Sequence, residues 1–172
     1  MRIRSLFVVL FVLGSIVGLQ GIALANDFVA EFTAIIEEKF DFLNDEGGQV
    51  YQVGDDNIAE LVGQQAYIYQ EGVGNQARGF QQGLNNWAGI YQQGNGNNGS
   101  IEQVGNDNWA GIQQLGNNNE ASISQRGFGN VASIRQVGNG NSANIQQNGN
   151  NFSANIFQRG NNNQASISQS SH

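Results

Sequence analysis

The sequence predicts an all-β protein, a β-solenoid of 22-residue strand-turn-strand rungs that stack into two parallel sheets. Three observations predict this fold. Glutamine recurs at steps of eleven residues from Gln70 to Gln169. Within each eleven-residue unit, apolar and amide residues lie two positions apart, which is the side-chain period of a strand. Each unit then ends in glycine and asparagine, the residues that close tight turns.

Residues 1–25 have the pattern of a secretory signal peptide. Arg2 and Arg4 precede an apolar run over residues 6–13, and an A-x-A site ends at Ala25. A transmembrane anchor would need about 20 uninterrupted apolar residues, which this stretch lacks. We therefore expect cleavage between Ala25 and Asn26, which removes two arginines and changes the net charge from −7 to −9.

Residues 26–48 form an acidic leader that differs in composition from the rest. Between residues 26 and 60 there are ten acidic residues and one lysine, whereas residues 61–172 carry four acidic residues and four arginines. Apolar side chains in the leader recur at helical spacing: Phe28, Phe32, Ile35, Ile36 and Leu43. This pattern predicts a short N-terminal helix or a disordered leader. Such a segment is either recognised during export and docking or acts as a cap on the following domain.

Residues 49–67 retain a weakened form of the repeat. Gln52, Gly54, Asn57 and Ala59 fit the motif, but the interval from Gln52 to Gln70 is four positions shorter than two repeat units. The segment is therefore either a defective additional rung or a cap.

Residues 68–172 hold ten units of the form N-x-A-x-I-x-Q-x-G-x-x, which is enough for five rungs. The repeat is interrupted where Gly79, Gly99 and Phe152 replace the expected residues. The isoleucines predicted to form the core are Ile90, Ile101, Ile112, Ile123, Ile134, Ile145, Ile156 and Ile167.

The same pattern places amide side chains in the core, where an unpaired amide costs about 1–3 kcal/mol. Stacking places equivalent amides above one another, so that they can bond as ladders along the stack. The predicted glutamine ladders contain Gln70, Gln92, Gln114, Gln136 and Gln158 in one column and Gln81, Gln103, Gln125, Gln147 and Gln169 in the other. The predicted asparagine ladder residues are Asn75, Asn86, Asn97, Asn108, Asn119, Asn130, Asn141 and Asn163.

The ends of such a stack are open strand edges, which template the addition of further strands. The chain has no proline, and no lysine follows Lys39, so the usual protection of strand edges is missing. These features predict a protein that polymerises.

Outward-facing residues are the remaining candidates for binding. Trp87 and Trp109 lie two repeat units apart, as do Tyr69 and Tyr91, so each pair stacks on one face. These stripes either bind a matrix polysaccharide or stabilise the sheet through cross-strand pairing. Six charged residues are expected to limit aggregation on the solvent face: Arg126, Arg135, Arg159, Glu102, Asp107 and Glu120.

Composition argues against catalysis and against several kinds of ligand. The chain has no cysteine, and its one histidine is the terminal His172, so we expect no catalytic site, no metal site and no cofactor. The negative charge argues against a nucleic-acid partner. An ice-binding solenoid would need threonine ladders, but the only threonine is Thr33. A calcium-binding β-roll would need aspartates in its turns, and after residue 60 only Asp107 is present.

The motif A-x-I-x-Q-x-G-x-x-N-x-A, as in residues 110–121, resembles the curlin-associated repeat of bacterial curli subunits. The resemblance covers residues 68–169. It implies export through an outer-membrane curli secretion channel with its accessory factors, and assembly into extracellular functional amyloid fibres of the biofilm matrix. The implied partners are the chain itself and a second curlin subunit.

The curlin family has a major fibre subunit and a minor subunit that nucleates fibre growth. Every strand here carries the glutamine and the leader is acidic and partly apolar, which is more similar to the nucleator. The regular last unit, residues 165–169, departs from the irregular basic repeat typical of the nucleator. The favoured expectation is the minor subunit, and the alternatives are the major subunit or, from another class, an ice-binding or carbohydrate-binding solenoid.

Overall fold

The structure is a computed structural model, and it describes residues 48–63 and 65–171. The predicted signal peptide and nearly all of the predicted acidic leader, residues 1–47, lie outside the described residues, as does His172. Twelve strands follow one another along the described chain: β1 (Gln49–Val53), β2 (Ile58–Val62), β3 (Ala66–Glu71), β4 (Gln76–Gln82), β5 (Trp87–Gln93), β6 (Asn98–Asn106), β7 (Trp109–Leu115), β8 (Glu120–Phe128), β9 (Val131–Val137), β10 (Ser142–Asn148), β11 (Ser153–Arg159) and β12 (Gln164–Ser170). The part of the chain that the structure describes contains no helix able to cross a lipid bilayer.

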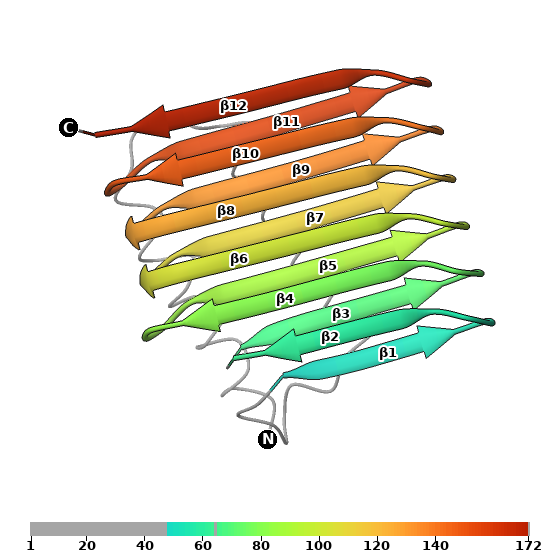
Figure 1. Cartoon of the computed structure of the whole chain (residues 1–172), viewed down its shortest axis with the longest axis horizontal. Helices are drawn as coiled ribbons and strands as arrows, with labels where there is room; N and C mark the ends of the chain where they lie inside the picture. Colours follow the sequence, from blue (N-terminus) through green and yellow to red (C-terminus); the bar gives the residue numbers. More distant parts are fainter. Residues whose placement is uncertain (1–47, 64, 172) are drawn as a thin grey trace, which may run out of the picture.

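The strands alternate between two parallel six-stranded sheets (Figure 1). The odd-numbered strands form the first sheet, in the order β1-β3-β5-β7-β9-β11, and the even-numbered strands form the second. We call these the odd sheet and the even sheet. Each pair of consecutive strands makes one rung. In the five rungs from β3 onward, paired residues lie two repeat units apart, as in Gln92↔Gln114. The predicted fold class is confirmed.

Residues 49–63 form the first rung, so the stack has one rung more than the ten regular units provide. In β1, Gln52 pairs with Gln70 in spite of the shorter interval between them. The shortening lies in the turn after β2, because Ala59 and Ala66 are seven residues apart, whereas their neighbours in the stack, Ala77 and Ala88, are eleven apart. The strands of this rung therefore keep register with the next rung, while one of its turns is cut short.

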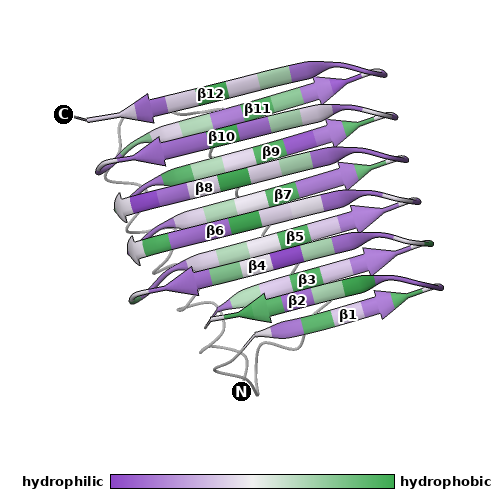
Figure 2. Cartoon of the chain, viewed as in Figure 1, coloured by the Kyte–Doolittle hydropathy of each residue, from purple (hydrophilic) through white to green (hydrophobic). Residues whose placement is uncertain are grey.

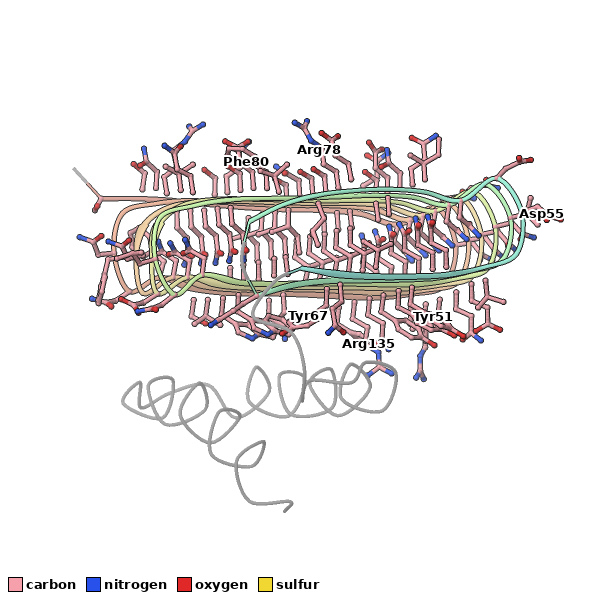
Figure 3. The ribbon with its side chains drawn as sticks, turned by 90° about the horizontal axis from the view of Figure 1, so that it is seen from below. Tyr51, Asp55, Tyr67, Arg78, Phe80 and Arg135 are labelled. Atoms are coloured by element: carbon pink, nitrogen blue, oxygen red, sulfur yellow. The ribbon has the colours of Figure 1, made fainter. Side chains whose placement is uncertain are left out.

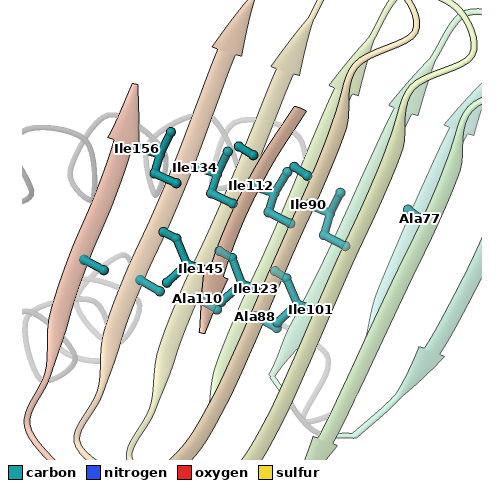
Figure 4. Packing of buried hydrophobic residues seen from close by; sticks show 14 of the residues in the cluster. Ala77, Ala88, Ile90, Ile101, Ala110, Ile112, Ile123, Ile134, Ile145 and Ile156 are labelled. Atoms are coloured by element: carbon teal, nitrogen blue, oxygen red, sulfur yellow. The ribbon is translucent and has the colours of Figure 1, made fainter. Parts of the chain in front are cut away.

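The core is a thin layer of alanine and isoleucine between the two sheets. Ile90, Ile112 and Ile134 project from the odd sheet and Ile101 and Ile123 from the even sheet, and each is at most 1 % exposed (Figure 4). Figure 3 shows the resulting flat cross-section, in which Arg78 and Phe80 project outward from one sheet and Tyr67 from the other. The predicted core isoleucines occupy this layer, but Ile167, in the last rung, is only partly buried.

Glycine and asparagine close the turns between the sheets. In a typical turn, Gly116 has φ +123° and Asn118 has φ +55°, conformations that most side chains disfavour. A side chain at Gly116 would also collide with the carbonyl oxygen of Gly138 in the next rung. Hydrophilic residues dominate these turns, whereas hydrophobic residues recur within the strands (Figure 2).

Candidate functional site: the amide ladders and the ends of the stack

The glutamines of the odd sheet form one continuous ladder of side-chain hydrogen bonds. Each Nε2 donates to Oε1 of the glutamine in the next rung. The bonds run from Gln52 to Gln70 (2.6 Å), Gln92 (2.8 Å), Gln114 (2.8 Å), Gln136 (3.0 Å) and Gln158 (2.9 Å). The sequence-predicted column is therefore brought together, and Gln52 extends it by one rung.

The even sheet carries the second ladder, with the same direction of donation. It runs from Gln81 to Gln103 (3.0 Å), Gln125 (2.8 Å), Gln147 (2.9 Å) and Gln169 (2.9 Å). Gln81 begins this ladder, because Gly63 lies beside it in the first rung.

From Gln70 onward in the odd sheet and from Gln103 onward in the even sheet, a second proton of each Nε2 binds a backbone carbonyl of the opposite sheet, across the core. Gln92, for example, donates to the backbone carbonyl of Gln76 at 2.8 Å, and Gln125 donates to that of Trp109 at 3.0 Å. Both protons of these amides are therefore used, which offsets the cost of burying them. The ladders also hold the two sheets together.

The asparagines also form ladders, in which the bonds between side-chain amides run in the opposite direction, from each asparagine to the one in the preceding rung. Asn97 Nδ2 donates back to Asn75 Oδ1 in the preceding rung at 3.1 Å and forward to the carbonyl of Gly116 at 2.7 Å. The same Oδ1 also accepts the backbone N–H of Asn97 at 3.0 Å. One column contains Asn57, Asn75, Asn97, Asn119, Asn141 and Asn163, and the other contains Asn86, Asn108 and Asn130.

Phe152 ends the shorter asparagine column but keeps part of the pattern. Its backbone N–H still donates to Asn130 Oδ1 at 3.0 Å. The substitution therefore removes only the side-chain contribution at the C-terminal end of that column.

Within the described residues, the stack ends in β1 and β2 on one side and in β11 and β12 on the other. The carbonyl of Asn163 accepts the N–H of Ser142 at 2.8 Å. Residues of a parallel strand face their two neighbours alternately, so the odd-numbered residues of β12 face β10. The backbone N–H groups of Ser166 and Ser168 consequently point to the open edge.

The amides of the last rung also point beyond the stack. Nε2 of Gln158 donates to the carbonyl of Ser142 at 3.0 Å, and Nε2 of Gln169 donates to that of Ser153 at 3.2 Å. Each has a second proton, which in every earlier glutamine of the two ladders binds the next glutamine. β12 carries no charged residue. The last rung therefore has the donors of another ladder step, and its strand β12 has none of the charges that protect strand edges, whereas β11 ends in Arg159.

The aromatic pairs stack on the outer face of the odd sheet. The ring centroids of Trp87 and Trp109 are 5.0 Å apart with an interplanar angle of 1°, and those of Tyr69 and Tyr91 are 4.8 Å apart at 5°. Tyr51 continues the tyrosine stack at 5.3 Å from Tyr69. Composition and spacing predicted this stacking, but nothing in the sequence pattern indicated that the Trp87–Trp109 and Tyr69–Tyr91 pairs are buried.

Burial also changes the acidity of one tyrosine. Tyr69 Oη donates to Glu71 Oε2 at 3.1 Å. Burial, together with this hydrogen bond and the negative charge of Glu71, raises the pKa of Tyr69 to about 12.

The predicted solvent-face charges are mostly exposed. Arg126 pairs with Glu102 at 3.3 Å, and Asp107 accepts a hydrogen bond from Asn85 Nδ2 at 3.1 Å. Glu120 and Arg159 are exposed, whereas Arg135 is half-buried. Exposed ion pairs of this kind add little stability. Over residues 48–63 and 65–171, no three His, Cys, Asp or Glu side chains gather as metal ligands would.

Part of the chain matches a protein-family model. The family model of the Curlin associated repeat matches residues 83–116 and residues 116–149. The comparison with curated proteins and the comparison with solved structures give no match. The matched segments lie in the regular part of the stack, and each begins and ends on a turn glycine: Gly83, Gly116 and Gly149. Residues 83–149, in the regular part of the two-sheet solenoid, are therefore similar to the Curlin associated repeat.

Proposed function

We propose that this chain is exported, polymerises end to end and forms extracellular curli fibres of the biofilm matrix. The observation that carries the proposal is the open last rung, where Gln158 on β11 has an uncovered side-chain donor and the neighbouring strand β12 carries no charge. A second chain that placed its first rung there would continue the odd-sheet ladder through its own Gln52. Its Asn57 would likewise meet Asn163.

The signal-peptide pattern over residues 1–25 supports export, and the acidic leader from Asn26 is the segment we assign to recognition by the secretion channel and its accessory factors. Among the two curli subunit types, we propose the minor, nucleating one. The acidic leader and the glutamine present in every regular rung support that choice. The partner of such a subunit is the second, major curlin.

The open edge of β12 can be tested with one substitution. Ser168 is exposed, and its N–H faces the edge, so Ser168→Pro removes a donor that the stack itself does not use. We expect the exported chain from Asn26 with Ser168→Pro to fold but to elongate poorly into thioflavin-binding fibres. Ser168→Ala keeps the N–H and is the matched control. Circular dichroism of the soluble chain checks that both variants form strands.

Seeding separates the nucleator from the major subunit. Sub-stoichiometric parent seeds should abolish the lag of a second curlin, and Ser168→Pro seeds should not. Equal elongation and seeding by Ser168→Pro and Ser168→Ala would place the templating surface at the other end of the stack. Parent seeds that leave the lag unchanged would reject the nucleator role.

A further inference from the structure

The two outer faces of the solenoid differ in both composition and burial. In β3, β5 and β7 of the odd sheet, the outward residues include Tyr67, Tyr69, Trp87, Tyr91 and Trp109, and all five are at most 9 % exposed. The outward residues of the even sheet, from β4 to β10, are mostly polar or charged, and none is buried. The residues named here on the odd sheet define what we call the aromatic face.

The burial extends to polar residues around the aromatic face. Gln113 on β7 is 3 % exposed and Ser133 on β9 is 1 % exposed. Ser122, at the equivalent position on the even sheet, is half-buried. The difference therefore follows the face of the molecule and not the size of the side chain.

Stacking between the rings does not account for this burial. The rings of Trp87 and Trp109 cover each other's faces at 5.0 Å, and one edge of Trp109 leans over Gly111 on the same strand. Such a ring still presents its outer edge to solvent. At the two ends of the same sheet, Tyr51 is 47 % exposed and Phe157 is 55 % exposed, although Tyr51 stacks on Tyr69. A cover over β3 to β9, and not over the edge strands, explains the pattern.

We propose that the acidic leader, residues 26–47, lies across the aromatic face and covers it. The leader joins the described chain at Gly48, immediately before β1, which is a strand of the odd sheet. As a helix this segment would span about 33 Å at about 1.5 Å per residue. The distance from β1 to β9 is about 19 Å at about 4.8 Å per strand. The leader is therefore long enough to reach from its attachment point across the whole buried region.

The composition of the leader fits this position. Its apolar residues, among them Phe28, Phe32 and Ile36, fall on one side of a helix, so that side can pack on the aromatic rings while the acidic residues stay in water. The face also carries a cation, Arg135 on β9, which complements the negative charge of the leader. A second copy of the chain is the less suitable occupant, because the burial is already present within a single chain.

A leader that covers the aromatic face would also determine the direction in which chains assemble. With the aromatic face occupied, the ends of the stack are the surfaces left for adding chains, and the solenoid grows lengthwise instead of sideways. A large exposed aromatic face would otherwise be an association site of its own.

Tryptophan fluorescence tests the proposal directly, because the chain has two tryptophans, Trp87 and Trp109, and both belong to the aromatic face. The experiment uses the soluble chain from Asn26, which lacks the signal peptide. Phe32→Asp with Ile36→Asp places two carboxylates on the apolar side of the leader. Ala30→Asp with Ala34→Asp places two on the opposite side and is the matched control. The readouts are the emission maximum and quenching by acrylamide.

We expect blue-shifted, weakly quenched emission in the parent and in the control. The Phe32→Asp, Ile36→Asp chain should show a red shift and several-fold stronger quenching. Solvent-exposed emission in all three chains would overturn the proposal. So would shielded emission in all three, because the cover would then be something other than the leader; loss of that shielding on dilution would identify a second copy. These readouts do not depend on fibre formation, so they can fail independently of the proposed function.

Discussion

Gly63 lies beside Gln81 where a glutamine would continue the even-sheet ladder, and Oε1 of Gln81 is buried without a hydrogen-bond partner. Every later glutamine of this ladder accepts a bond from the preceding rung. The gap arises because the residue in register with Gln81 is a glycine, which has no side-chain amide. A side chain cannot simply be restored at Gly63, whose φ is +137°.

This gap makes the effect of glutamine substitutions depend on position. Gln125→Ala leaves a donor on Gln103 and an acceptor on Gln147 without partners, at about 1–3 kcal/mol each. Gln81→Ala breaks only the bond to Gln103 and removes the unpaired Oε1 as well. We expect urea unfolding of the soluble chain to show a clearly larger loss for Gln125→Ala. Equal losses would mean that the ladders add little to stability.

Replacing a turn glycine by alanine should strongly lower the stability of the fold only where the added side chain would meet another rung. Gly116→Ala meets the carbonyl oxygen of Gly138, so the stack must open there. Gly74 has φ +67°, but a side chain at that position would have no atom within 4 Å, so Gly74→Ala costs about 1–2 kcal/mol of backbone strain alone. Thermal unfolding followed by circular dichroism should show a large loss for Gly116→Ala and a small one for Gly74→Ala. A similar loss for both would indicate that strain, and not stacking, governs these turns.

Isoleucine substitutions should differ between the core and the outer face of the stack. Ile123 is 1 % exposed, and Ile123→Ala should destabilise the fold by about 2–5 kcal/mol through lost burial and a cavity. Ile58, on β2, is 61 % exposed, and Ile58→Ala should change stability by less than about 0.5 kcal/mol. Urea unfolding of both variants, in parallel with the parent, checks this contrast. A large loss at Ile58 would show that the first rung is more tightly packed than its exposure indicates.

Alkaline pH should destabilise the fold through Tyr69. Because folding raises its pKa from 10 to about 12, the stability that depends on neutral Tyr69 is complete below pH 10 and is lost as the pH rises through about 12. Tyr69→Phe should retain more of its stability across that range. Glu71→Gln, which removes the carboxylate, should lower the pKa of Tyr69 toward 10.

Phenolate absorbance follows this titration. The absorbance change that the parent has and Tyr69→Phe lacks should be centred near pH 12. If it were centred near the ordinary pKa of a tyrosine, the phenol would be in contact with water and the assignment of burial at Tyr69 would be wrong.

Sequence periodicity predicted the architecture because stacking leaves little freedom. Residues two repeat units apart, such as Gln92 and Gln114, occupy the same position in successive rungs. Because both side chains project inward, their amides meet and form a ladder between the two sheets. The direction of the ladders could not be predicted, since spacing fixes where an amide lies but not which way it turns. The sequence also did not show that the first rung keeps the register of the stack. The interval from Gln52 to Gln70 is shorter than two repeat units, but the strands pair normally because only a turn is shortened. The buried state of Trp109 depends on what covers the sheet, which the repeat does not encode.

The unmatched position at Gly63 would also affect the lifetime of the proposed fibre. In a filament of chains stacked end to end, each chain contributes one such position, so one missing glutamine recurs every six rungs, or about 29 Å at about 4.8 Å per strand. Shear would then break the filament at intervals of whole chain lengths. Each break exposes two fresh ends, and every fragment can elongate again, so mechanical damage to the filament multiplies the number of growing filaments.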